Sequence, residues 1–140
     1  MVAFNSQGTN NTVFLHKDAE TTTHMVTGPS GSIIQDQTFY PWGQSWHNLG
    51  TWYQQEFASL DIADPTTGFY TSLSRTYNPV PGRWISPDPS GQKSASPSDP
   101  QSWNMYAYVR NNPATLTNPT GLIDCTGQYA QGPGCQAIFK

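Results

Sequence analysis

Short apolar and aromatic runs alternate with polar turns along the whole chain. The run at 50–57 alternates aromatic and polar residues, which is typical of a half-buried β-strand. We expect strands at 12–16, 22–27, 32–40, 50–57, 69–77, 83–86 and 115–117. Clusters of Pro, Gly, Asn and Asp lie between several of them and favour turns. The pattern therefore predicts a mainly β fold of short antiparallel strands and hairpins.

One segment has the composition of a short helix. Residues 103–110 read W-N-M-Y-A-Y-V-R, and N-N-P follows them. Because proline disfavours helical geometry at the preceding residue, Pro113 predicts the end of a helix near 103–110. The 12 glycines and 12 prolines are spread along the chain, which excludes long helices.

Charge and composition exclude several classes of protein. The 140 residues include only six Lys and Arg, and the formal net charge is −3. Because the basic residues are scattered, they form no patch for a nucleic acid. No apolar run approaches the roughly 18 residues of a membrane span, and no signal-peptide segment follows Met1. Aromatic residues make up 13% of the chain, so the core depends on them. We expect Trp84, Tyr77, Tyr106 and Tyr108 to be buried together.

Two cysteines, Cys125 and Cys135, lie near the C-terminal end of the sequence in a Gly-rich segment. A disulfide closing this loop would stabilise the fold by about 2–3 kcal/mol through loop-closure entropy. Free thiols are the alternative in a reducing compartment. A zinc site needs three or four ligands, and His16, His24 and His47 lie far away along the chain. We expect a disulfide if the protein is exported, and no metal or cofactor.

Four ordered motifs between residues 64 and 122 resemble the repeat-associated core of Rhs/YD-repeat proteins. The family signature runs D-x-x-T-G-L-x-Y, R-Y-Y-D-P-x-x-G-R-F-x-S-x-D-P, N-x-Y-x-Y-x-x-N-N-P and D-P-x-G-L. The matching segments are D-P-T-T-G-F at 64–69, R-T-Y-N-P-V-P-G-R-W-I-S-P-D-P at 75–89, N-M-Y-A-Y-V-R-N-N-P at 104–113 and N-P-T-G-L at 118–122. Asn78 and Asn118 stand where the family has Asp.

The resemblance implies an organisation and a set of partners. Residues 1–56 would be YD-repeat-like β-strands, residues 57–122 the repeat-associated core and residues 123–140 a C-terminal tail. Full-length relatives wind their repeats into a hollow β shell around a C-terminal toxin. We therefore expect a fragment or short stand-alone relative, with a larger Rhs shell or a toxin segment as a possible partner and an extracellular or cell-surface location.

The resemblance also implies a self-cleavage site. Relatives cut themselves after the Leu of D-P-x-G-L with two aspartates, one a base that activates water and the other protonated to polarise the carbonyl. The positions assigned here are Asp64 and Asp88, with Arg83 as a charge partner and Leu122–Ile123 as the bond.

A second interpretation makes both aspartates turn residues, because each is followed by proline. A hairpin centred near Val80 sets Asp88 opposite Ser72 and leaves Asp64 about 26 Å along the extended partner strand. Only a fold-back of the turn at 64–69 would bring the two carboxyls together. We therefore expect a non-catalytic structural module, with a self-cleaving aspartyl peptidase as the alternative.

The N-terminal strands favour self-association. They are rich in Thr, Gln, Asn and aromatic residues and have few charges, which suits strand addition from a neighbouring copy. We expect a homo-oligomer or filament, with residues 1–16 as the exchanged strand. The Trp and Tyr residues leave a surface carbohydrate-binding module as a further alternative.

Overall fold

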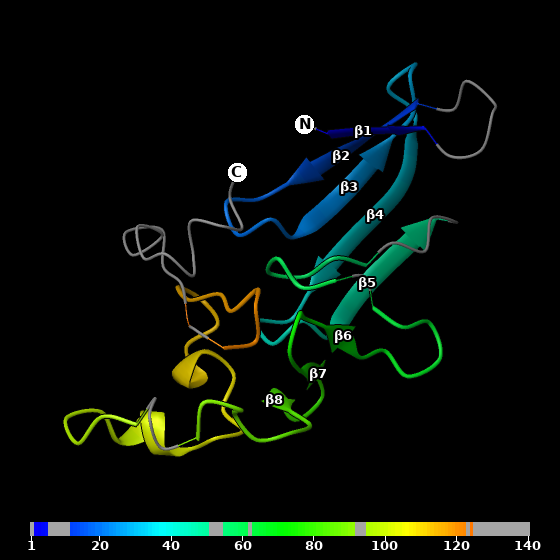
Figure 1. The fold of residues 1–140 in the computed structure, drawn as a ribbon. Coiled ribbons are helices and arrows are strands. Elements are labelled where there is room, and N and C mark those ends of the chain that lie inside the picture. Colours follow the sequence, from blue (N-terminus) through cyan, green and yellow to red (C-terminus); the bar gives the residue numbers. More distant parts are fainter. Residues whose placement is uncertain are drawn as a thin grey trace.

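The computed structural model describes residues 2–5, 12–50, 55–61, 63–91, 95–122 and 124. Two antiparallel sheets organise these residues, a five-stranded sheet in the order β1-β2-β3-β4-β5 and a three-stranded sheet in the order β6-β7-β8 (Figure 1). The larger sheet consists of β1 (Val2–Asn5), β2 (Thr12–Lys17), β3 (Thr23–Thr27), β4 (Ile33–Phe39) and β5 (Ser45–Gly50). The smaller consists of β6 (Tyr70–Thr71), β7 (Thr76–Asn78) and β8 (Arg83–Trp84). The prediction of a mainly β fold is confirmed.

The strand that follows β4 is β5, which ends at Gly50, so it begins earlier than the strand predicted at 50–57, and residues 55–57 lie in no strand. The turn between the two strands is tighter than the sequence suggested. The Tyr40 N–H donates to the Gln44 carbonyl at 2.8 Å, and the Gly43 N–H donates to the Tyr40 carbonyl at 2.8 Å. Gly43 has a φ of +84°, a conformation that glycine adopts without steric cost. The chain therefore re-enters the sheet at Ser45, and residues 51–54 lie outside the described ones.

The predicted strand at 69–77 is a hairpin. Its turn closes where the Ser72 N–H donates to the Arg75 carbonyl at 2.9 Å, and the Ser72 hydroxyl accepts the Arg75 N–H at 3.1 Å. The Ser72 side chain thus accepts a backbone N–H that a continuous strand would pair with a neighbouring strand. The strand predicted at 115–117 is reduced to a β-bridge at Thr117, because residues 113–115 form a turn.

The predicted helix near 103–110 is wrong. The described segment has two short 3-10 helices, η2 (Pro100–Trp103) and η3 (Val109–Asn111), with a turn between them. The Asn104 side chain accepts the Tyr106 N–H at 3.2 Å, and the Trp84 N–H donates to the Tyr106 carbonyl at 3.0 Å. Hydrogen bonding to β8 therefore keeps this segment in a turn instead of a helix.

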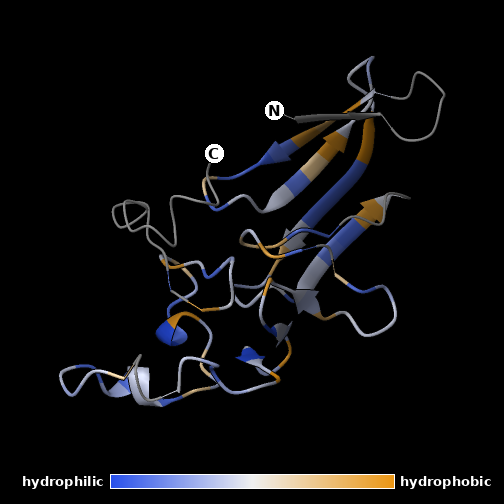
Figure 2. Ribbon diagram, viewed as in Figure 1, coloured by the Kyte–Doolittle hydropathy of each residue, from blue (hydrophilic) through white to orange (hydrophobic). Residues whose placement is uncertain are grey.

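Two clusters of buried side chains form the core. The larger is aromatic and lies between the smaller sheet and the segments around it, and the smaller lies on one face of the larger sheet. The first consists of Phe57, Ala58, Leu60, Ala63, Tyr70, Tyr77, Trp84, Tyr108 and Val109, and the second of Val13, Leu15 and Val26. Figure 2 shows a hydrophilic stretch along β4, where two buried glutamines lie. The predicted burial of Trp84, Tyr77 and Tyr108 is confirmed, whereas Tyr106 is 45% exposed.

Candidate functional site

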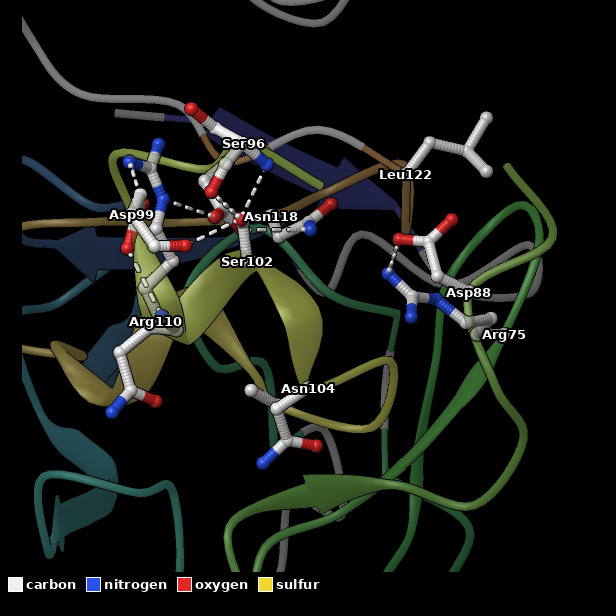
Figure 3. A pocket seen from close by; sticks show the side chains of 12 residues that line it. Arg75, Asp88, Ser96, Asp99, Ser102, Asn104, Arg110, Asn118 and Leu122 are labelled. Atoms are coloured by element: carbon white, nitrogen blue, oxygen red, sulfur yellow. Dashed lines mark hydrogen bonds and ion pairs between the residues drawn. The ribbon is translucent and has the colours of Figure 1, made fainter. Parts of the chain in front are cut away.

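A polar pocket of about 270 Å³ lies where residues 88–124 fold back against the β6–β7 hairpin. Figure 3 shows its side chains, which come from the hairpin, from η2 and η3 and from the end of the described chain. Five of the lining residues are charged: Arg75, Asp88, Asp99, Arg110 and Asp124. They form two separate groups, one buried and one at the surface.

Arg75 is the centre of the buried group. It ends the β6–β7 turn, and its side chain is only 3% exposed. One amino group lies 3.2 Å from the Asp88 carboxylate, the other donates to the Met105 carbonyl at 3.2 Å, and Nε donates to the Gly121 carbonyl. The guanidinium carbon also lies 4.4 Å from the centre of the Trp84 ring, a cation–π contact. Arg75 thus joins four segments of the chain.

Burial lowers the pKa of Arg75, and the carboxylates of Asp88 and Asp124 oppose this effect. Arginine remains protonated in proteins because its ordinary pKa is so high. The guanidinium therefore brings a fixed positive charge into the interior, and its hydrogen bonds compensate for the lost water.

Asp88 is held by its own turn as well as by Arg75. Its side chain is 12% exposed, and Oδ1 accepts the Ser90 N–H at 2.8 Å and the Ser90 hydroxyl. Its backbone N–H donates to the Met105 carbonyl at 2.9 Å. The turn that follows Asp88 therefore orients the carboxylate toward the pocket, as the D-P-S-G sequence at 88–91 favours.

Arg110 is the centre of the surface group. Its Nη1 donates to Asp99 at 3.1 Å, and its Nε donates to Asp124 at 3.0 Å. The hydrogen bond to Asp124 is the main cause that raises the pKa of Arg110. Arg110 has a φ of +52°, so the chain reverses here and carries the side chain back over η2. The surface group therefore ties the end of the described chain to η2.

Asn118 lies between the two groups and is buried. Its Nδ2 donates to the Asp124 carboxylate at 3.0 Å, whereas Oδ1 has no hydrogen-bond partner among the described residues. A turn follows, in which the Gly121 N–H donates to the Asn118 carbonyl at 3.2 Å and the Ser74 hydroxyl donates to the Thr120 carbonyl at 2.7 Å. This turn brings Leu122 to the pocket wall.

The structure separates the two aspartates that the sequence paired. Asp64 is exposed and does not line the pocket. Its Oδ1 accepts the N–H groups of Thr66 at 3.0 Å and Thr67 at 2.7 Å and the Thr67 hydroxyl at 2.9 Å. The Thr67 backbone hydrogen bond is the largest of the causes that lower the pKa of Asp64. Asp64 therefore stabilises its own turn.

Of the other predicted site residues that the structure describes, one lines the pocket and one does not. Arg83 is exposed on β8, and the arginine that contacts Asp88 is Arg75 instead. Leu122 lines the pocket. Ile123, Cys125 and Cys135 lie outside the described residues.

Most residues of the pocket escaped the sequence-based prediction, and two of these carried a signal in the sequence. Arg75 is the first residue of the motif that resembles R-Y-Y-D-P, and Asn118 is the departure from Asp in D-P-x-G-L. The described residues include no group of three His, Cys, Asp or Glu that could hold a metal ion. In the same part of the chain, no helix has the length and apolar character needed to cross a membrane.

The comparisons with known proteins identify relatives among toxins, and no family model matches the chain. Toxin subunit YenC2 of Yersinia entomophaga is 35% identical over 97 residues, which are 66% of this chain and 9% of that protein. Double-stranded DNA deaminase toxin A of Burkholderia cenocepacia is 29% identical over 123 residues, or 84% of this chain and 8% of the relative.

The same relationship appears in three dimensions. The crystal structure of TcdB2-TccC3 superimposes with a TM-score of 0.70 and 27% identity, covering 84% of this chain and 6% of that one. The chain thus spans less than a tenth of the length of these relatives. The chain is therefore related to Rhs-containing toxin subunits, YenC2 among them.

Proposed function

We propose that the chain is a non-catalytic structural module, a repeat-associated core that holds the segment 118–124 in place and associates with further copies of itself. Residues 1–56 would supply YD-repeat-like strands, 57–122 the core and 123–140 a tail. A larger Rhs shell or a toxin segment is the proposed partner, and the proposed location is extracellular or at the cell surface; the names of the relatives as toxins support both.

The pairing of charges in the pocket supports a non-catalytic role. An aspartyl peptidase needs two carboxyls that face each other and share a proton, so that one is a base and the other an acid. Here Asp88 contacts Arg75 and Asp124 contacts Arg110. The amide of Asn118, whose Nδ2 donates to Asp124, stands where the family signature has an acid. An amide can neither activate water as a base nor donate the proton of a carboxylic acid.

The limited extent of the similarity supports a structural role. The match to a toxin subunit and the match to a DNA deaminase toxin each occupy less than a tenth of the relative. A segment common to proteins with such different names fits a scaffold better than an effector domain.

The uncovered edges of the larger sheet support self-association. β1 pairs with β2 within the chain, so it has a partner on one side and, like β5, lies at an edge of the sheet. At the other end, β5 pairs with β4, and no described strand covers its outer side. All six residues of β5 are exposed and none is a Lys, Arg, Asp or Glu. Such an edge lacks the charges that keep other sheets apart. We therefore propose β5 as the associating edge, with residues 1–16 at the opposite edge as the alternative.

Mass spectrometry of the intact protein tests the non-catalytic role. After prolonged incubation, we expect the mass of all 140 residues, without release of residues 123–140. A second candidate, the self-cleaving peptidase, is favoured only by the position of Leu122 beside Asp88 in the pocket. Cleavage of the parent chain after Leu122 would contradict the proposal.

A variant distinguishes an incomplete peptidase site from a purely structural pocket. If the pocket lacks only the second carboxyl, Asn118→Asp will cut after Leu122, and adding Asp88→Asn will abolish the cut. If the pocket has only its structural role, Asn118→Asp will stay intact.

Sizing with light scattering tests the self-association. We expect oligomers that Leu49→Lys on β5 disrupts, because a lysine on an edge strand opposes strand addition. The matched control is Leu73→Lys, at an exposed leucine of the β6–β7 turn. A full-length chain that remains a monomer of 15.4 kDa at high concentration would contradict the proposal.

A further inference from the structure

The short helix η3 (Val109–Asn111) has left-handed backbone geometry. Its three residues have φ values of +43°, +52° and +60°, and the Asn111 N–H donates to the Tyr108 carbonyl at 2.9 Å. None of the three is a glycine. Residues with a side chain disfavour the left-handed region, and for a β-branched valine it is a clear outlier. Contacts outside the turn must therefore hold it in this conformation.

Three of these contacts attach η3 to the core and to η2. Val109 is fully buried in the aromatic cluster. The Asn111 amide donates to the Gln101 side chain of η2 at 2.6 Å. Arg110 Nη1 donates to the carboxylate of Asp99, the N-cap residue of η2, at 3.1 Å. Each residue of the left-handed turn is thus tied to a neighbouring part of the molecule.

The fourth contact comes from the end of the described chain. Arg110 Nε donates to Asp124 Oδ2 at 3.0 Å, and Asp124 Oδ1 accepts the Asn118 amide at 3.0 Å. The Asp124 side chain is 17% exposed, so water and salt screen its charge less than that of a surface carboxylate. Asp124 therefore connects the left-handed turn to the turn at 118–122, which lies at the pocket.

We propose that η3 is a strained switch, which Asp124 holds closed while residues 118–122 occupy the pocket. When a partner binds this segment and withdraws it, Arg110 loses one of its two carboxylates. The backbone at 109–111 then returns to a favoured φ, which moves the Arg110 side chain away from Asp99 and frees η2. The inference rests on the proposed role of the module in holding the segment, and it adds a response to the loss of that segment.

A purely structural turn would behave differently. If the burial of Val109 alone fixed the left-handed geometry, loss of Asp124 would loosen only residues 118–122. In a strained turn, the unfavourable φ values oppose every contact that holds it, so the loss of one contact brings the turn closer to opening. The two cases therefore differ in the protection of the backbone N–H groups at 109–112.

Hydrogen exchange of the full chain, followed by mass spectrometry of its peptides, measures this protection. We expect Asp124→Ala to speed exchange at 109–112 by about fivefold or more. The matched control is Asp61→Ala, at an exposed aspartate that accepts the Thr71 hydroxyl at 3.3 Å and does not line the pocket. It should keep the parent rate at 109–112. Unchanged exchange of peptides from β2 to β4 shows that both variants are folded.

Two substitutions of Arg110 test the strain itself. Both remove the ion pairs, but only glycine adopts a φ of +52° without steric cost. We expect residues 109–112 to exchange faster in Arg110→Ala than in Arg110→Gly. A turn with ordinary φ values would give the reverse order, because glycine is the more flexible residue. In the Arg110→Gly chain, Asp124→Ala should have no further effect at 109–112, since the arginine that Asp124 contacts is absent.

Either of two results would overturn the switch. The first is exchange at 109–112 that stays at the parent rate in Asp124→Ala, because the burial of Val109 would then suffice to hold the turn. The second is exchange in Arg110→Gly that is as fast as in Arg110→Ala, or faster. Neither result contradicts the proposed function, which is tested by the mass and the size of the parent chain and not by its exchange rates.

Discussion

The two sheets of this chain are stabilised in opposite ways. The larger sheet has longer pairings, with four residue pairs between β1 and β2 and five between β4 and β5, but its buried apolar cluster consists of only Val13, Leu15 and Val26. The smaller sheet has strands of two or three residues and a large aromatic cluster. The larger sheet thus relies mainly on backbone hydrogen bonds, and the smaller sheet mainly on the burial of apolar side chains.

Buried amides replace apolar side chains in the larger sheet. Gln35 and Gln37 are both fully buried, and Gln35 donates to Gln37 at 2.8 Å and to Asn48 at 2.9 Å. Gln37 donates in turn to the Thr23 carbonyl at 2.5 Å. These hydrogen bonds offset part of the cost of burying the amides, since Gln35 Oε1 has no hydrogen-bond partner among the described residues, and they add little net stability. The larger sheet therefore depends on its backbone ladder more than on its core.

In the smaller sheet, aromatic rings supply the buried apolar surface that the larger sheet lacks. The Tyr77 ring centre lies 4.4 Å from that of Tyr108 and 5.7 Å from that of Trp84. The hydroxyls of Tyr70 and Tyr77 donate to the Gly43 and Trp42 carbonyls, each at 2.8 Å. These two hydrogen bonds join the aromatic cluster to the β4–β5 hairpin. A change in the cluster should therefore affect the whole molecule.

The largest effect should follow from truncating the aromatic cluster. Trp84 is 2% exposed and contacts Tyr77, Tyr108 and Arg75. We expect Trp84→Ala to lower the free energy of unfolding by about 3–5 kcal/mol, because it leaves a large cavity. Urea denaturation followed by circular dichroism measures this loss. A variant that melts within a degree or two of the parent would contradict the role given to the cluster.

A smaller effect should follow from the equivalent change in the larger sheet. Leu15 is buried, but its apolar neighbours are few. We expect Leu15→Ala to cost about 2–3 kcal/mol, at the low end for buried leucine, because less packing is lost. The same denaturation experiment applies. A loss equal to that of Trp84→Ala would show that the two regions do not differ as described.

The sequence predicted which aromatic residues are buried better than it predicted where strands and helices begin and end. Mainly β structure and the burial of Tyr77, Trp84 and Tyr108 follow from aromatic residues flanked by turn residues, and both are confirmed. The start of β5 did not follow: Pro41 and Gly43 mark the turn at 40–43, but S-W-H-N-L-G at 45–50 lacks the apolar–polar alternation of a half-buried strand. The helix at 103–110 failed because pairing with β8 overrides local propensity.

The candidate site was less predictable than the fold. Asp88 and Leu122 lie in the pocket as the motifs suggested, but Asp64 does not line it. The spacing of residues along the sequence could not predict the contacts between distant segments that define the pocket, such as Arg75 with Gly121 or Arg110 with Asp124. These contacts join residues that are 46 and 14 positions apart along the chain.

Alkaline pH should weaken the aromatic cluster. Burial raises the pKa of Tyr70, Tyr77 and Tyr108 above the ordinary value of 10.0. The unfolded chain therefore loses these protons first, so the stability that they contribute is present below pH 10 and falls as the pH rises above it. We expect the free energy of unfolding to decrease above about pH 10, less steeply in Tyr77→Phe than in the parent. Tyr40→Phe, at an exposed ring, is the matched control, and equal slopes for the two variants would contradict the prediction.

The smallest effect should come from the turn that precedes the smaller sheet. Asp64 is fully exposed, and its hydrogen bonds to Thr67 and Thr66 lower its pKa from the ordinary 3.8. A lowered carboxyl pKa contributes stability above the unfolded value, and this contribution is lost as the pH falls through the folded value. We expect the parent to melt slightly above Asp64→Asn near neutral pH, and the difference to shrink as the pH falls below the ordinary pKa of 3.8 and through the lowered folded-state pKa. Asp61→Asn, at another exposed aspartate, is the matched control, and thermal melts over this pH range measure both. A difference between parent and Asp64→Asn that is constant with pH would mean that the ionised carboxylate does not stabilise the turn. Because the turn lies outside both buried clusters, even complete loss of its contribution should leave the two sheets folded.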